Sequence, residues 1–138
     1  MDIIVDANIL FAALIRKSVT SELMFRDDLQ LYAPEYIFAE FEKYRNVVKN
    51  KTSRSDEDFN QLLSVFERRI QLVPLEEIAP YLKQASEISP DPKDLPYLAL
   101  AMKMHAAVWS NDKVLKQEQN TVKIISTHEL MGILNVEF

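Results

Sequence analysis

The sequence predicts an α/β fold, a three-layer α/β/α sandwich around a central parallel sheet of about four to five strands. Short runs of β-branched residues alternate along the chain with longer segments whose apolar residues recur at helical spacing. Gly132 is the only glycine, so the tight turns that antiparallel hairpins need are scarce. A length of 138 residues with 48% hydrophobic content suits one compact domain over residues 1–138.

The amino-terminal part begins with a short buried strand. Residues 3–5 form an uninterrupted β-branched run, as expected of a strand covered on both faces, and 8–15 are apolar and helical. Thr20 or Ser21 is expected to cap a second helix that ends near Arg26.

The next expected strand, 29–33, alternates between residues that face opposite sides of the sheet. Pro34 is expected in the first turn of a helix that runs to about residue 49, because the fixed backbone angle of proline suits that position. The polar segment 50–54 ends this helix, and a cluster of caps and acids predicts another over 56–69. The apolar residues of that helix fit either the core or a dimer interface; they are Phe59, Leu62, Leu63 and Phe66.

The third expected strand is 71–73, and 75–88 is the helix that follows it. The prolines of 89–92 make the next segment irregular, because each removes a hydrogen-bond donor. Asp94 is expected to begin a further helix, whose apolar residues predict a buried stripe. These residues are Leu95, Leu98, Ala99, Met102 and Ala106.

Two short apolar runs, 107–109 and 123–125, are the last expected strands, and 127–131 is the closing helix. Strands that alternate with helices predict parallel β-α units with helices on both faces of the sheet.

Four acidic residues stand where the expected strands end or helices begin. Asp6 and Asp112 each follow a strand, and ligands of open parallel sheets bind beyond the carboxyl ends of the strands. Asp94, at a helix start, can point to the same edge, and Glu40 lies on a partly apolar helix face that is unusual for a surface acid. Mg²⁺ prefers such carboxylate oxygens, so the sequence predicts a divalent-metal site and phosphodiester cleavage.

Each acid also has an ordinary explanation. Asp94 can act as a helix N-cap, and Asp6 and Asp112 can end a strand or cap the following helix. Glu40 can pair at the surface with Lys43 or Tyr44. Sequence alone leaves these alternatives open.

The composition excludes several classes of protein. The absence of cysteine rules out disulfides and thiolate zinc sites, and a single glycine rules out a P-loop and a dinucleotide-binding fingerprint. Apolar stretches fall far short of the ~20 residues of a membrane span, and an acid near the amino terminus argues against a secretory signal. A cytoplasmic location without membrane contact is therefore expected.

The net charge of -5 argues against nucleic-acid binding unless a metal ion reverses the local sign. One stretch is nevertheless basic and can follow a phosphate backbone, with Lys43, Arg45 and Lys49 as candidates and Lys51 and Arg54 nearby. The alternative is a solvated helix end, because cations complement the helix dipole there.

Together the acids lie in motifs that resemble those of a PIN domain. The motifs are Val5-Asp6-Ala7-Asn8-Ile9-Leu10, a helical Glu40, Asp91-Pro92-Lys93-Asp94-Leu95-Pro96-Tyr97-Leu98-Ala99-Leu100-Ala101 and Trp109-Ser110-Asn111-Asp112-Lys113. The resemblance covers nearly the whole chain, and spacing and hydrophobic flanks match as well as the acids.

This resemblance implies a ribonuclease that depends on Mg²⁺ or Mn²⁺, often the toxin of a prokaryotic toxin–antitoxin pair and often a homodimer. RNA would be the substrate and a cognate antitoxin protein the partner. The implied catalytic and metal-binding residues are Asp6, Glu40, Asp94 and Asp112, with Asn8 and Asn111 as accompanying polar residues and Asp91 as a further candidate.

Two details of the implied site stay open. Ser110 or Asn111 can orient a water molecule or a phosphate oxygen, or simply form the turn after a strand. The family frequently has another acid two positions after the last of the set, where this chain has Val114, so the number of metal ions is undecided.

Two other functions fit an acidic edge on this kind of sheet. A receiver-type phosphoacceptor domain also places acids around Mg²⁺, but this chain lacks the paired acids expected near the end of the first strand. A catalytically silent binding module would keep the fold and use the acidic pocket, or another face, for a partner protein.

Overall fold

The structure, a computed structural model, describes residues 1–89 and 91–136. Its centre is a sheet of five parallel strands in the order β3-β2-β1-β4-β5. The strands are β1 (Asp2–Val5), β2 (Gln30–Pro34), β3 (Ile70–Val73), β4 (Ala107–Trp109) and β5 (Ile124–Ile125). The predicted α/β class with a parallel sheet is confirmed.

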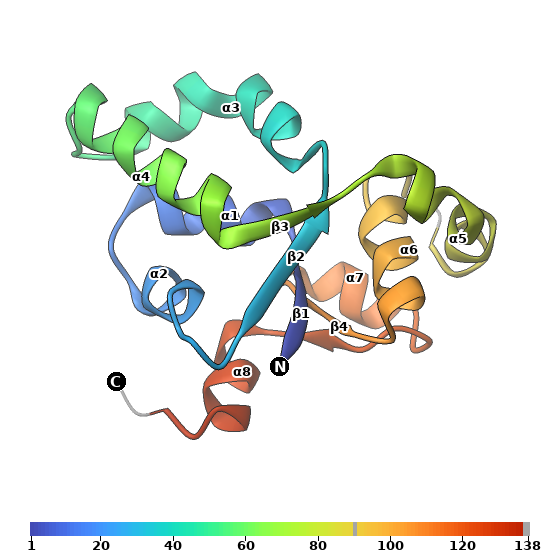
Figure 1. Cartoon of the computed structure of the whole chain (residues 1–138). Helices are drawn as coiled ribbons and strands as arrows, with labels where there is room; N and C mark the ends of the chain where they lie inside the picture. Colours follow the sequence, from blue (N-terminus) through green and yellow to red (C-terminus); the bar gives the residue numbers. More distant parts are fainter. Residues whose placement is uncertain (90, 137–138) are drawn as a thin grey trace.

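Helices cover both faces of this sheet, as Figure 1 shows. On one side lie α1 (Ala7–Ile15), α2 (Val19–Met24), α3 (Ile37–Lys51) and α4 (Asp56–Arg69). On the other lie α5 (Leu75–Ile88), α6 (Leu95–Met104) and α7 (Lys113–Glu118), and α8 (Thr127–Ile133) follows β5. All of these helices are too short or too polar to cross a lipid bilayer, as far as the described residues extend.

The strand order creates a switch point between β1 and β4. The chain first proceeds from β1 outward to β2 and β3, and then returns to the other side of β1 for β4 and β5. The last residues of these two central strands, Val5 and Trp109, are register partners. Crevices at such switch points are the usual ligand sites of open α/β sheets. The segments that follow Val5 and Trp109 therefore border the expected site.

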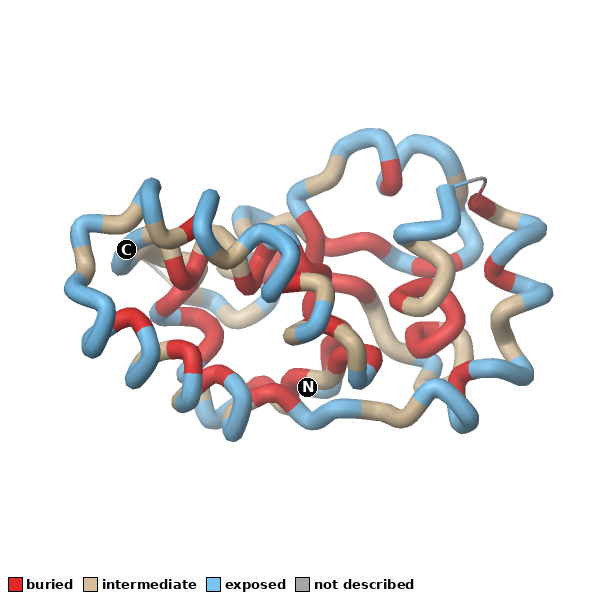
Figure 2. Tube along the Cα trace, turned by 90° about the horizontal axis from the view of Figure 1, so that it is seen from above, coloured by how far each residue is buried: buried red, intermediate tan, exposed pale blue. Residues whose placement is uncertain are grey.

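Apolar residues from both layers of helices meet on the sheet, and Figure 2 shows the buried segments running through the middle of the molecule. Ile3, Ile4 and Val5 are fully buried because helices cover both faces of β1, which is why the strand reads as a continuous apolar run. Phe59, Leu63 and Phe66 of α4 are also buried. That stripe is therefore part of the core, and the alternative of a dimer face does not hold for these three side chains.

Two predicted helix starts were wrong. Pro34 does not begin a helix: it ends β2 opposite Val73, and α3 begins only after Tyr36. Proline is tolerated there because the last residue of a strand can lack a donor, as at other strand ends and edges. The second helix is capped by Ser18 rather than by Thr20 or Ser21. The Ser21 hydroxyl instead accepts a hydrogen bond from Ser18 N at 2.9 Å, from inside the first turn.

One helix, α7, was absent from the predicted elements. It has only six residues and a single buried side chain, Leu115, so the periodic signal of an amphipathic helix is missing.

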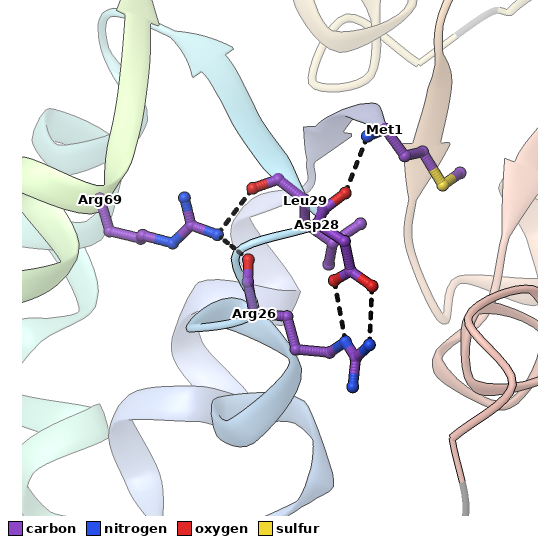
Figure 3. Close-up of polar contacts among 5 residues, drawn as sticks. All are labelled: Met1, Arg26, Asp28, Leu29 and Arg69. Atoms are coloured by element: carbon purple, nitrogen blue, oxygen red, sulfur yellow. Dashed lines mark hydrogen bonds and ion pairs between the residues drawn. The ribbon is translucent and has the colours of Figure 1, made fainter.

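An arginine organises the loop between α2 and β2, at the amino-terminal edge of the sheet (Figure 3). The guanidinium of Arg69, the last residue of α4, donates hydrogen bonds to the carbonyl oxygens of Met24, Arg26 and Leu29 at 2.7, 2.5 and 2.7 Å. Asp28 in the same loop pairs with the Arg26 side chain at 2.6 Å, and its carbonyl accepts from the terminal amino group of Met1 at 2.8 Å. This network fixes the edge opposite the carboxyl ends of the strands.

Candidate active site

Asp6 lies where β1 ends and α1 begins. Its amide donates to the carbonyl of Trp109 at 3.1 Å, which continues the pairing of β1 with β4 by one residue. The side chain is almost enclosed, at 9% exposure, and its Oδ2 accepts a hydrogen bond from the Ser110 hydroxyl at 2.7 Å. Burial raises the pKa of the Asp6 carboxyl, the Ser110 hydrogen bond opposes this, and the charges of Asp112 and Glu40 raise it further.

Ser110 connects the ends of the two central strands. Its hydroxyl donates to Asp6 and also accepts from the amide of Asp112 at 3.1 Å, while its own amide donates to Ile125 of β5 at 3.0 Å. The residue is 2% exposed. Ser110 is therefore more than a turn residue: it holds one acid and positions the main chain of another.

Asp112 is the N-cap of α7, so the ordinary explanation considered for it is correct. Its Oδ1 accepts from the amides of Val114 and Leu115 at 3.0 and 3.2 Å. Capping uses only one carboxylate oxygen, and the same side chain contributes to the raised pKa values of Asp6 and Asp94. Asp112 therefore combines a structural contact with a place near the other acids. Val114 itself is apolar and 61% exposed.

Asp94 occupies the N-cap position of α6, but its side chain forms no capping hydrogen bond. Burial raises the pKa of its carboxyl to about 7, and the charges of Asp91, Asp6 and Asp112 contribute. Capping therefore does not explain this acid. Asp91 is exposed, and its Oδ1 accepts from the amide of Lys93 at 3.0 Å within the turn that precedes α6.

Glu40, in the first turn of α3, contacts a residue that the sequence argument did not select. The Tyr97 hydroxyl on α6 donates to Glu40 Oε2 at 3.0 Å, whereas the ordinary explanation considered for Glu40 was a pairing with Lys43 or Tyr44. Tyr97 is 2% exposed, and burial raises the pKa of its phenol, with Glu40 and Asp6 contributing. The sequence signal that could have identified Tyr97 is a tyrosine among the aliphatic residues that follow Asp94.

The accompanying asparagines are placed differently from each other. Asn8 is exposed in the first turn of α1. Asn111 donates to the Thr127 hydroxyl at 3.0 Å and accepts from the Thr127 amide at 2.8 Å, and Trp109 Nε1 donates to the same hydroxyl at 3.0 Å. Asn111 therefore joins the end of β4 to the start of α8, a structural contact that its sequence position did not predict.

Two of the three basic candidates are engaged with neighbouring side chains. Arg45 forms an ion pair with Glu42 at 3.0 Å, and its guanidinium lies 5.7 Å from the centre of the Phe59 ring. Lys49 forms an ion pair with Asp56. Their contacts tie α3 to α4 or stay within α3. The third, Lys43, is exposed and lies next to Glu40 on a groove described below.

The acids suit a divalent cation by their chemistry. Among the residues that the structure describes, no three acidic or histidine side chains converge as a closed ligand set. Mg²⁺ does not require one, because it usually keeps several waters and binds through one or two carboxylates. Asp6, Glu40, Asp94 and Asp112 present only oxygen donors. Burial raises the pKa values of the Asp6 and Asp94 carboxyls and of the Tyr97 phenol, and the charges of Asp6, Glu40 and Asp112 contribute. An added cation would relieve that repulsion.

Another cavity lies away from the four acids. A space of about 720 Å³ is bordered by α5, α6 and the residues before β4 and β5, and none of the four acids lines it. The volume of this cavity does not identify the active site. The acids lie at the other edge of the sheet, beyond the carboxyl ends of the strands, where ligands of such sheets bind.

Comparison with known proteins agrees with this geometry. The family model described as "PIN domain" matches residues 4–130. The chain belongs to the PIN domain family, whose members are generally nucleases that use divalent metals.

Among solved structures, the chain is similar to VapBC2 from Rickettsia felis, a crystal structure bound to a DNA fragment from their promoter. The TM-score is 0.66 at 15% identity, with 91% of this chain and 98% of the other covered. At that identity the likeness concerns the fold. A search of the curated proteins found no match.

Proposed function

We propose that this protein is a divalent-metal-dependent endoribonuclease and the toxin component of a toxin–antitoxin pair. Asp6, Glu40, Asp94 and Asp112 would hold Mg²⁺ or Mn²⁺ at the carboxyl edge of the sheet. Membership of the PIN family and likeness to the fold of VapBC2 support the class. The arrangement of hydrogen bonds on the acids supports the chemistry.

The observation that carries the proposal is that protein donors hold one oxygen of three of these carboxylates. Ser110 holds Asp6 Oδ2, Tyr97 holds Glu40 Oε2, and amides of α7 hold Asp112 Oδ1. No side chain of residues 1–89 and 91–136 donates a hydrogen bond to the second oxygen of any of the three, so this oxygen can face a ligand, and the held oxygen fixes its direction. Such outer contacts orient metal ligands in other proteins.

A bound Mg²⁺ or Mn²⁺ would activate a water molecule for attack on the scissile phosphate and neutralise charge on the leaving oxygen. The side chains around it have separate tasks. Asp6 is held most firmly, by burial and by Ser110, and serves as the central ligand. Asp94, with a pKa of about 7, is about half protonated near neutral pH without metal, which limits repulsion there, and a bound cation would favour its ionised form. Asn8 and Asn111 flank this edge as polar neighbours, and Asp91 lies one turn before Asp94.

The strand order disfavours the receiver alternative. Receiver domains of the flavodoxin-like class have the order 2-1-3-4-5, whereas this sheet has β3-β2-β1-β4-β5. A silent binding module stays compatible with the same fold, and the cleavage assay decides between it and an enzyme.

The test is RNA cleavage by the purified protein. Labelled single-stranded RNA, a hairpin RNA and single-stranded DNA are incubated with Mg²⁺ or Mn²⁺, and with EDTA as the control. Wild-type protein should cleave RNA only with metal, and Asp6→Asn, Asp94→Asn and Asp112→Asn should each lose at least about 100-fold in rate. Asp27→Asn, which removes an exposed acid from the loop after α2, is the matched control and should cleave normally. Equal, metal-independent rates in all variants would refute the assignment.

The partner and assembly form a second part of the proposal. A cognate antitoxin would bind and inhibit this chain, which would act as a homodimer in the cytoplasm. Light scattering of the purified protein tests the dimer, and co-expression with the neighbouring reading frame, followed by loss of cleavage in the copurified complex, tests the antitoxin.

A further inference from the structure

A groove of about 430 Å³ opens beside Glu40, on the surface of α3. One wall comes from the start of α3, and the other from the turn that precedes α6, so the groove joins two segments far apart in the chain. Its lining includes Glu40 itself, which makes it continuous with the candidate active site. The other principal lining residues are Tyr36, Lys43, Tyr44, Pro92 and Lys93.

The groove carries a lysine on each wall. Lys43 on α3 and Lys93 in the turn before α6 are both exposed, and neither forms an ion pair within residues 1–89 and 91–136. This distinguishes Lys43 from Lys49, which is paired. Glu40 is the one acid among the lining residues, and the Tyr97 hydroxyl binds one of its oxygens. Two ammonium groups beside a metal-binding acid complement a phosphate backbone that approaches a metal site.

An aromatic ring on the same groove is held in place from behind. Tyr44 is 43% exposed, and its ring centre lies 5.9 Å from that of Phe11 at an angle of 55°. Phe11 in turn packs against the buried Phe41 at 5.8 Å. The tyrosine is therefore anchored to the core and still open to solvent at the groove. Aromatic rings in this situation are stacking platforms for unpaired bases.

We propose that this groove is a substrate subsite for single-stranded RNA. A base stacks on Tyr44, the flanking phosphates contact Lys43 and Lys93, and the chain continues past Glu40 to the scissile phosphate. The inference rests on the proposed ribonuclease function and extends it, because it assigns a binding surface outside the acidic set. RNA is favoured over a protein ligand since the groove combines cations, an open aromatic ring and continuity with the acids.

The experiment measures RNA binding separately from cleavage. A fluorescein-labelled single-stranded RNA of 12 nucleotides is titrated in Ca²⁺ at 4 °C, and a gel confirms that it stays intact. The double variant Lys43→Ala/Lys93→Ala should bind at least tenfold more weakly than wild type. The slope of log affinity against log salt concentration should fall by about 1.4, since each phosphate contact on a single strand contributes about 0.7.

The matched control removes the same charge at the opposite end of the molecule. Lys103 lies in the last turn of α6 and Lys123 just before β5, both on the amino-terminal side of the strands. Lys103→Ala/Lys123→Ala should keep the wild-type affinity and salt slope.

The stacking contact has its own variants. Tyr44→Ala should weaken binding about tenfold, and Tyr44→Phe should retain most of the affinity, because a base stacks on either aromatic ring. If Tyr44→Ala fails to fold, Tyr44→Leu keeps an apolar contact with Phe11 without offering a ring.

The outcomes separate this inference from the proposed function. In Mg²⁺ or Mn²⁺ the lysine double variant should raise KM more than it lowers kcat. Wild-type cleavage together with wild-type binding and salt slope in the groove variants would overturn the subsite and leave the nuclease intact. Groove-dependent RNA binding without any metal-dependent cleavage would refute the nuclease and leave the subsite. Tighter binding of a labelled poly-glutamate peptide, lost in the same double variant, would overturn RNA as the ligand.

Discussion

Replacing Asp94 by asparagine should stabilise the metal-free protein at neutral and alkaline pH. Burial of the Asp94 carboxyl raises its pKa to about 7, and the charges of Asp91, Asp6 and Asp112 add to this. The side chain forms no capping hydrogen bond, so an amide of the same shape loses no contact that the carboxylate makes. The variant therefore removes the cost of burying a negative charge and of holding it near other negative charges.

The size of the effect follows from the pKa. The difference between the ordinary pKa of 3.8 and the raised pKa of about 7 corresponds to about 4 kcal/mol in the free energy of unfolding if solvent does not screen the charge. Asp94 is only partly buried, and solvent screening reduces this to about 1–2 kcal/mol. For a chain of this length that is about 3–6 °C in melting temperature.

The sign depends on pH in a defined way. Below pH 3.8 the carboxyl is protonated in both the folded and the unfolded state, so the two proteins should have the same stability. As the pH rises from 3.8 towards 7 the unfolded chain ionises first, and the wild type loses stability. The advantage of Asp94→Asn should therefore grow over this window and level off near pH 8.

Melting temperatures recorded by circular dichroism in EDTA, from pH 4 to pH 8.5, measure this difference. Asp27→Asn removes an exposed acid and should show no pH-dependent gain. Adding Mn²⁺ should raise the melting temperature of the wild type more than that of Asp94→Asn, because binding to the folded state stabilises it. A lower melting temperature for Asp94→Asn in EDTA at every pH would show that the residue is structural and would refute the argument.

Three further substitutions test the contacts that hold the site and the fold. Ser110→Ala removes the donor to Asp6 and should weaken Mn²⁺ binding at least about tenfold, as measured by titration calorimetry. Ser110→Thr keeps the hydroxyl and serves as the control. Equal Mn²⁺ affinity for the wild type and both variants would count against the positioning role of Ser110. Tyr97→Phe deletes only the 3.0 Å hydrogen bond to Glu40, so kcat for RNA cleavage should fall about tenfold with little change in melting temperature. An unchanged kcat would contradict a role of Tyr97 in positioning Glu40. Arg69→Met leaves three carbonyl oxygens without their donor and should lower the free energy of unfolding by about 2–4 kcal/mol, as measured by urea titration. A loss below about 0.5 kcal/mol would contradict the structural role of the Arg69 hydrogen bonds.

Helices with strong local sequence signals, such as caps and prolines at their ends, were predicted correctly. Residues 56–69 and 75–88 were predicted with the observed bounds, because Ser55 caps the first helix and accepts from Asp58 N at 3.1 Å, and Pro74 precedes the second. Pro34 was misplaced because proline suits both a helix start and a strand end, and only pairing with Val73 distinguishes them. Elements with weak local signals, such as α7, depend on tertiary contacts.

The sequence alone determined the chemistry available at the site. Acids stand at the ends of segments that form strands and helices, and the chain contains no cysteine, so any metal must be bound through oxygen or nitrogen. These properties can be predicted from the sequence because they depend on residue type and on spacing over a few residues.

Tertiary structure alone decided how Asp6 and Glu40 are held. Ser110 reaches Asp6 across 104 positions of sequence and Tyr97 reaches Glu40 across 57. The first contact exists because β4 pairs with β1, and the second because α6 packs on β1 and β2, and α3 follows β2. Periodicity describes neighbours within a few residues and carries no information about which distant segments meet. Which carboxylate oxygens are held, and which remain for a ligand, is therefore a property of the folded sheet and its switch point.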